Sequence, residues 1–373
     1  MKRFGKCANA RKTGRLFVLA AMAAAAFCAF GETWHLAGDD DGGTSSLVSG
    51  QGAGWGTADG SQTTKVVGGE DDYVIDDHQM RTPEGSDVTF GGRSLSMTGG
   101  TILFKGSTPG KRVDLPNFLV PGGTALFKGG VNESTFTVGG SCAIAAGAAL
   151  SVNTSADGGH FRNFILEMNF SGDGMIQLVT PDNSKQSTVT LAGSLADFTG
   201  NVSAGGVWQI FQIASEDSYP ADTAEERPAG VSVVGGTQLD VLASGTIGPN
   251  PGLDLGKTVP VTINVAEGVT LTVTGPIGGS AGFAKTGPGT VVLAGGSLSG
   301  TVTILEGVVQ VDDPTDVPNA QFVEDGGTLA VMARKAVAAD AGVTWAKGRV
   351  PTPAGPIEVE WNLADGRPDV RVT

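Results

Sequence analysis

Residues 188–193 read Thr-Val-Thr-Leu-Ala-Gly, and residues 290–295, 102 positions later, read Thr-Val-Val-Leu-Ala-Gly. A second match follows each copy at an offset of 100, where Gly200-Asn201-Val202 corresponds to Gly300-Thr301-Val302. Two residues are therefore missing between the matched segments of the second copy. Strands that keep their register while the loops between them change length are typical of stacked coils. The repeat predicts a solenoid.

The rest of the chain is divided by glycine into short apolar runs. Of the 373 residues, 59 are Gly and only 6% are aromatic, so small aliphatic side chains must fill the interior. The runs alternate with period two, which is the pattern of strands. The predicted strands are 94–97, 101–104, 124–127, 135–138, 148–152, 175–179, 188–191, 231–234, 238–242, 261–265, 269–274, 290–293, 302–305, 308–311 and 328–331. Glycine corners and narrow strands favour a parallel β-solenoid, and a β-sandwich stays open as the alternative.

Residues 1–31 have the order of a secretory signal peptide. Six basic residues precede an apolar run over 16–30, and small residues stand at Ala29 and Gly31, so we expect cleavage near Gly31. The apolar run of about 15 residues is shorter than the roughly 20 that a membrane-spanning helix needs, which favours export over the alternative of an anchor. We expect contact with the membrane only through this segment before cleavage.

Cleavage would make an acidic chain more acidic. The formal net charge would change from −14 to −20, because residues 1–31 carry six positive charges and no negative ones. Phosphate backbones and anionic lipid surfaces attract basic proteins. The charge therefore disfavours nucleic acid as a partner.

The most specific pattern lies in residues 282–311. It contains Lys285-Thr286-Gly287-Pro288-Gly289-Thr290 and closes with Gly307-Val308-Val309-Gln310-Val311. This stretch of about 30 residues closely resembles the autotransporter-associated β-strand repeat of bacterial surface proteins, and a degenerate copy covers 188–203. The resemblance implies a right-handed parallel β-helix in an exported, passenger-like region, and it implies no catalytic residues. Strand alternation directs six side chains inward: Val291, Leu293, Val302, Ile304, Val309 and Val311.

We accordingly expect an all-β chain with a single elongated domain and irregular caps. Its predicted parts are a signal peptide over 1–31, an irregular N-terminal lead or cap over 32–69, a parallel β-helix over 70–332 and a C-terminal cap or tail over 333–373. One short helix is predicted over 333–341.

Motifs for catalysis are weak. Residues 252–258 have part of a phosphate-binding loop, but its first glycine is one residue too close and no strand-to-helix context surrounds it. The three histidines, His35, His78 and His160, are far apart and have no metal-ligand spacing. Cys142 is the one cysteine after residue 31, and its apolar neighbours predict a buried packing thiol.

Acidic pairs are the remaining candidates. Asp71-Asp72 and Asp76-Asp77 flank a short apolar stretch, and Asp312, Asp313 and Asp316 follow a predicted strand. Such carboxylates can bind Ca²⁺ or form a glycosidase pair, but exposed aspartates in turns are far commoner. The sequence therefore predicts no catalytic, cofactor-binding or metal-binding residue.

Two classes of function follow. We expect an exported, noncatalytic β-helix with a structural or adhesin-like role, secreted or on the cell surface, with a periplasmic location as a further option. Its expected partners are glycans or other surface proteins, and no cofactor is expected. The alternative is a carbohydrate-active β-helix enzyme, a polysaccharide lyase or glycoside hydrolase. Such an enzyme would gather charged side chains on one face of consecutive coils.

Overall fold

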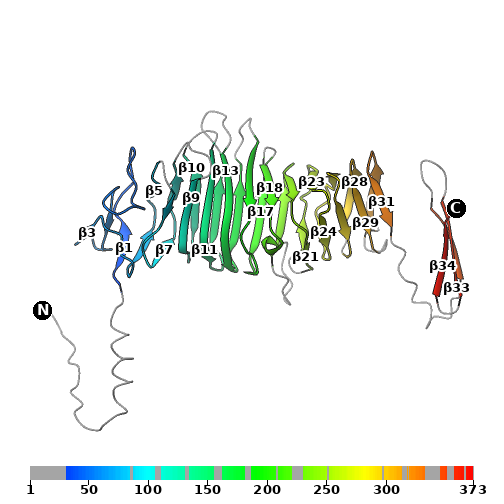
Figure 1. The fold of residues 1–373 in the computed structure, drawn as a ribbon, viewed down its shortest axis with the longest axis horizontal. Coiled ribbons are helices and arrows are strands. Elements are labelled where there is room, and N and C mark those ends of the chain that lie inside the picture. The colour runs from blue at the N-terminus through cyan, green and yellow to red at the C-terminus, as the bar shows by residue number, and fades with distance from the viewer. Residues whose placement is uncertain are drawn as a thin grey trace, which may run out of the picture. The chain divides into compact units, whose positions relative to one another are not determined.

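The computed structural model describes residues 31–84, 87–105, 111–130, 134–154, 162–180, 186–206, 209–220, 230–249, 252–295, 298–312, 317, 319–331, 345–350, 357–364 and 367–372. These ranges contain strands and one short 3-10 helix but no α-helix. Parallel strands wind into a β-solenoid, which confirms the predicted fold class (Figure 1). The chain divides into two compact units, Met1–Met175 (unit 1) and Ile176–Thr373 (unit 2).

Unit 1 has two parallel sheets. The strands on one side of its coils are β1 (Thr33–Leu36), β4 (Asp72–Ile75), β6 (Val88–Thr89), β7 (Ser94–Met97), β9 (Lys111–Val120), β11 (Ser134–Ile144) and β13 (Arg162–Gly172). Those on the other side are β5 (Gln79–Arg81), β8 (Thr101–Phe104), β10 (Thr124–Gly129) and β12 (Ala149–Asn153). Tyr73 on β4 pairs in parallel with Leu95 on β7, 22 residues later. One coil therefore takes about 22 residues here.

The middle of unit 1 is filled by aromatic rings. Phe104 makes edge-to-face contacts with Phe127 and Phe164, at centroid distances of 5.2 and 5.3 Å. These rings lie in the coils that contain the long strands β9, β11 and β13. Cys142 on β11 pairs in register with Phe118 and Phe170 and is fully buried, so the predicted packing role of this thiol is confirmed.

Residues 32–69, predicted as an irregular lead or cap, contain three short strands joined by turns and irregular segments. The strands β2 (Trp55–Gly56) and β3 (Thr63–Thr64) extend β1 by antiparallel pairing. Trp55 is 1% exposed and stands edge-to-face on Tyr73 at 4.8 Å. A small aromatic core therefore anchors this segment to the first parallel coil.

Unit 2 has three parallel sheets. One contains β15 (Ser187–Leu191), β16 (Asp197–Phe198), β18 (Gln209–Ile213), β20 (Gln238–Val241), β23 (Val261–Val265), β26 (Phe283–Thr286), β28 (Ser299–Ile304) and β30 (Asn319–Glu324). A second contains β14 (Met175–Val179, which begins at the unit boundary), β17 (Asn201–Gly205), β19 (Val231–Val234), β22 (Leu253–Asp254) and β25 (Ile277–Gly278). The third contains β21 (Gly245–Ile247), β24 (Thr270–Val273), β27 (Thr290–Leu293), β29 (Val308–Val311) and β31 (Thr328–Val331). The 3-10 helix η1 spans Glu216–Ser218.

The six side chains predicted to point inward in residues 282–311 are all buried, at 2% exposure or less. Register explains this: Val291 on β27 pairs with Val309 on β29, and Val302 on β28 pairs with Phe283 on β26. Apolar side chains of successive coils therefore stack on one another inside unit 2.

The C-terminal residues include a three-stranded antiparallel sheet of β32 (Trp345–Val350), β33 (Ile357–Ala364) and β34 (Arg367–Val372). The helix predicted over 333–341 and the signal peptide residues 1–30 lie outside the described residues. In the described part of the chain, no helix has the length and apolar character needed to cross a membrane.

Candidate functional site

Two histidines and three aspartates meet at the corner that follows β4 in unit 1. His35 on β1 lies beside the corner because β1 pairs in parallel with β4. Its Nδ1 is 2.7 Å from Oδ2 of Asp76. The hydroxyl of Thr98, which follows β7, donates to the other oxygen of Asp76 at 2.9 Å. Three successive coils therefore contribute to this contact.

The state of Asp76 fixes the tautomer of His35. Burial pushes the pKa of Asp76 upward, but hydrogen bonds from His35 and Thr98 outweigh it, so the pKa is lowered on balance. An ionised carboxylate only accepts hydrogen bonds, so Nδ1 of His35 must carry the proton. In the neutral ring, Nε2 is then the atom that can accept a hydrogen bond or a proton.

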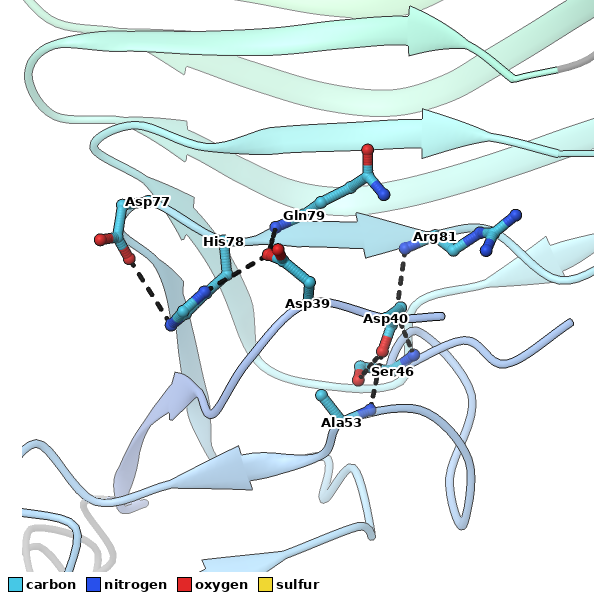
Figure 2. A network of polar contacts seen from close by, with 8 residues as sticks. All are labelled: Asp39, Asp40, Ser46, Ala53, Asp77, His78, Gln79 and Arg81. Carbon is cyan, nitrogen blue, oxygen red and sulfur yellow. Dashed lines mark hydrogen bonds and ion pairs between the residues drawn. The ribbon is translucent and has the colours of Figure 1, made fainter. Parts of the chain in front are cut away.

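His78 occupies the same corner and contacts two other carboxylates (Figure 2). Its Nδ1 is 3.3 Å from Oδ1 of Asp39, and its Nε2 is 3.6 Å from Oδ1 of Asp77. Asp39 also accepts a hydrogen bond from the backbone of Gln79 at 2.7 Å. Asp77 is 85% exposed, so the longer contact lies in solvent.

A buried carboxylate next to this corner has a structural role. Asp40 is 3% exposed, and Figure 2 shows it at the centre of four hydrogen bonds. Oδ2 accepts from the backbone nitrogens of Ser46 and Arg81 at 2.7 and 2.9 Å. Oδ1 accepts from the Ser46 hydroxyl and the Ala53 nitrogen at 2.6 and 2.8 Å. Asp40 therefore ties the N-terminal loop to β5.

His35 and Asp76 line a surface pocket of about 480 Å³, a size within the usual range for small-molecule sites. The remaining lining residues are small or apolar and come from β1 and the residue after it, from β2 and β3, and from the connection between β2 and β3: Leu36, Ala37, Gly56, Thr57, Ala58, Gly60 and Thr63. The pocket therefore presents one oriented imidazole and one carboxylate against an otherwise small-residue wall. We take this pocket as the candidate ligand site of unit 1.

The sequence pointed to the Asp76-Asp77 pair but not to the two histidines beside it. His35 and Asp76 are 41 residues apart, and only the stacking of β1 on β4 brings them together. In the other candidate pair, Asp71-Asp72, the second aspartate has a structural role. Asp72 forms a two-point contact with Arg93 and accepts from the Ser94 hydroxyl at 2.6 Å. Hydrogen bonding to Arg93, partly opposed by burial, lowers the pKa of Asp72.

The remaining predicted residues bring no chemistry together. In the phosphate-loop-like segment, Leu253 and Leu255 are buried and the Gly256 nitrogen donates to Asp254 at 2.9 Å, so the segment is a strand and a turn. Asp312 accepts from the Gln310 side chain at 2.7 Å. His160, Asp313 and Asp316 lie outside the described residues. Within the described ranges, no three His, Cys, Asp or Glu side chains gather as metal ligands would.

Three charged side chains do gather on the outer face of unit 1. Arg112 on β9 contacts Asp114 on its own strand at 2.8 Å and Glu167 on β13. Between them lies Gly139 on β11, which pairs with Asp114 on one side and Glu167 on the other. A Cβ at Gly139 would overlap the Arg112 guanidinium. Because Gly139 has no side chain, the Arg112 side chain can extend from β9 over β11 to Glu167 on β13.

Unit 2 carries a polar ladder on its outer face. The ladder consists of Thr190, Gln212, Asp240, Asn264 and Thr286, which pair in register on β15, β18, β20, β23 and β26. Adjacent members are joined by side-chain hydrogen bonds of 2.8, 3.0, 3.0 and 3.5 Å. Asp240 at the centre accepts from both amide neighbours. Each coil is therefore linked to the next by its outward side chains.

No family model matches this chain, and no curated protein or solved structure matches it either.

Proposed function

We propose that this protein is an exported, noncatalytic β-solenoid with a structural or adhesin-like role, secreted or held at the cell surface. The polar ladder of unit 2 is the observation that carries this proposal. Its amide, hydroxyl and carboxylate groups form hydrogen bonds to one another from coil to coil, so these outward polar groups satisfy one another and stabilise the stack of coils. The ladder places a polar side chain at the same position of five successive strands, and weak contacts to several coils gain strength when they engage at once.

The charged groups of the described residues support the same proposal. A carbohydrate-active enzyme of this fold would gather charged side chains on one face of consecutive coils to contact its substrate, and three charged side chains do gather on unit 1. These side chains contact one another, because Arg112 is shared between Asp114 and Glu167, so the one positive charge is taken up within the cluster. Asp72 is similarly paired with Arg93. Export is supported by the basic, apolar and small-residue order of 1–31, and a surface role by the resemblance of 282–311 to a repeat of bacterial surface proteins.

The test starts with the full chain carrying a C-terminal epitope tag in a bacterial host. We expect the tag in the medium or on intact cells, where added protease can reach it. Purified exported protein should bind cells or glycans measurably when displayed in many copies on beads and only weakly as single molecules. Retention in the cytoplasm would overturn the export proposal. Equal binding by single molecules and beads would overturn the multivalent role.

The pocket of unit 1 favours a second candidate, a carbohydrate-active enzyme. Its oriented His35–Asp76 pair has the geometry of a general base held by a carboxylate. The test is a screen of polysaccharides with the purified protein and with His35→Ala. The matched control is His78→Ala, because His78 contacts carboxylates at the same corner but does not line the pocket. Turnover lost with His35→Ala and kept with His78→Ala would establish this alternative over the noncatalytic role.

A further inference from the structure

The first described residues of unit 1 are fixed by the acidic segment that precedes β4. The backbone nitrogen of Glu32 donates to Oδ1 of Asp71 at 2.8 Å. The carbonyl oxygen of Glu32 accepts from the nitrogen of Asp72 at 3.0 Å. Glu32 is therefore held through both of its backbone polar groups before β1 begins.

Gly31 lies in a place that no larger residue can occupy. A Cβ added there would overlap the backbone carbonyl of Glu70. Ala29, near the end of the apolar run, and Gly31, directly after it, are also small residues. Signal peptidases recognise small residues at the first and third positions before the bond they cut, which points to the bond between Gly31 and Glu32.

We propose that export cuts the chain between Gly31 and Glu32, and that the new α-ammonium group of Glu32 is then held by the carboxylate of Asp71. The inference rests on the export route proposed above. A signal peptidase hydrolyses the peptide bond: water supplies the hydroxyl that completes the Gly31 carboxyl group and a proton for the Glu32 nitrogen. At neutral pH that amine takes up a further proton and becomes an ammonium.

The charges around Glu32 favour this arrangement. Arg93 is the cation that interacts with Glu70, Asp71 and Asp72, and the side chain of Glu32 adds a fourth acidic group. Cleavage places a second positive charge at a nitrogen that already lies at hydrogen-bond distance from Asp71. Hydrogen bonds between ionised groups are stronger than those between neutral ones. The cut therefore turns an amide contact into an ion pair.

The first test identifies the cut and uses Gly31→Ala. Alanine is equally acceptable to the peptidase but does not fit beneath Glu70. If residue 31 is removed, Gly31→Ala leaves the mature protein unchanged; if residue 31 is kept, Gly31→Ala destabilises it. We expect wild type and Gly31→Ala to yield the same mature mass, starting at Glu32, and the same melting temperature. A mature chain that keeps residue 31, or that begins elsewhere, would overturn the inference. An uncut chain retained in the cytoplasm would instead overturn the export proposal.

The second test measures the ammonium itself. Mature wild type, Asp71→Asn and Glu70→Gln are labelled at their N-terminus with an amine-selective reagent near neutral pH. Only the deprotonated amine reacts, so we expect Asp71→Asn to label several-fold faster than wild type. Glu70→Gln removes the same charge from the adjacent residue and should label like wild type. Equal rates in wild type and Asp71→Asn, or an equal increase in both variants, would refute pairing with Asp71.

Discussion

The ammonium nitrogen of Lys285 donates to the carbonyl oxygen of Gly287 at 2.7 Å inside unit 2. Lys285 lies on the inward face of β26, where it pairs in register with Ile263 and Ile304, and it is fully buried. The same nitrogen donates to the carbonyls of Thr286 and Glu306 at 2.7 and 3.3 Å. One lysine thus satisfies three carbonyls in two successive coils.

We expect Lys285→Met to destabilise the protein by about 2–4 kcal/mol, because buried carbonyls lose a charged donor while the side-chain volume is nearly kept. Urea unfolding of the full chain measures the change. Lys257→Met is the control, since Lys257 is exposed and should cost little. Equal effects of the two variants would contradict the role assigned to Lys285.

The same lysine should give stability an alkaline pH dependence. Burial lowers the pKa of Lys285 to about 8 from an ordinary value of 10.5. Between these two values the unfolded chain binds more protons than the folded one, so the free energy of unfolding rises with pH. The cost of Lys285→Met should therefore grow from pH 8 to pH 10, by at most about 3 kcal/mol.

The comparison must be made as a difference between wild type and Lys285→Met. Burial raises the pKa values of Cys142 and Tyr219, so these groups ionise first in the unfolded chain and reduce stability at alkaline pH. Both variants share that loss, which cancels in the difference. If the stability difference between wild type and Lys285→Met stays constant from pH 8 to pH 10, the pKa of Lys285 is not lowered in the folded protein.

Adjacent glycines on β11 should respond very differently to alanine. At Gly139 a Cβ meets only the flexible end of Arg112 and the Asp114 side chain, so Gly139→Ala should cost no more than about 1 kcal/mol, the value of surface ion pairs. At Gly140, φ is +106° and a Cβ would overlap the backbone of Leu115. We expect Gly140→Ala to cost about 2 kcal/mol or more.

A double-mutant cycle checks the reason for the smaller effect. In an Arg112→Ala background the guanidinium is gone, so Gly139→Ala should then be neutral or stabilising. A cost at Gly139 that persists without Arg112 would mean that something other than this crossing requires the glycine.

Asp40→Asn should destabilise unit 1 by about 2–4 kcal/mol. Each oxygen of Asp40 accepts two hydrogen bonds, and at least one donor to each is a backbone N–H group, so an amide nitrogen in either position must face a donor. Asp77→Asn is the matched control because that carboxylate is almost fully exposed. Thermal melts of both variants measure the effect, and a similar small shift in both would contradict it.

Cys142 should be inert in the folded protein. Its thiol is fully buried, and burial raises its pKa, which removes the reactive thiolate. We expect alkylation by iodoacetamide only when urea unfolds the chain. Rapid labelling of the native protein would show that β11 opens or that the thiol is accessible.

The alternation of small apolar residues made much of the fold predictable. Strands such as Ser94–Met97, Val261–Val265 and Val308–Val311 have the predicted bounds, because their inward and outward side chains differ clearly in polarity. Strand β13 was not predicted, although Phe164, Leu166, Met168 and Phe170 alternate on it. Its outward residues include Glu167 and two asparagines, which have low strand propensity.

Lys285 and the His35–Asp76 pair show what the sequence alone could not provide. A charged residue at an inward position contradicts the usual hydrophobic pattern, so strand β26 was not predicted. The folded structure explains the inward lysine, because turn carbonyls surround its nitrogen and Gly307 leaves room for it. A Cβ at Gly307 would lie 2.9 Å from the Lys285 nitrogen. His35 and Asp76 meet because coils stack, and no local spacing encodes that contact.

The direction of the backbone hydrogen bonds in unit 2 has a mechanical consequence. In parallel coils these bonds point along the stacking direction. Tension applied along that direction therefore breaks the hydrogen bonds between one pair of coils at a time and does not shear all of them together. Each peeled coil of about 20 residues would release roughly 70 Å of extended chain. A protein built this way would yield under tension in small successive steps. The step that separates Lys285 from the Glu306 carbonyl of the next coil would resist more than a step without such a bond.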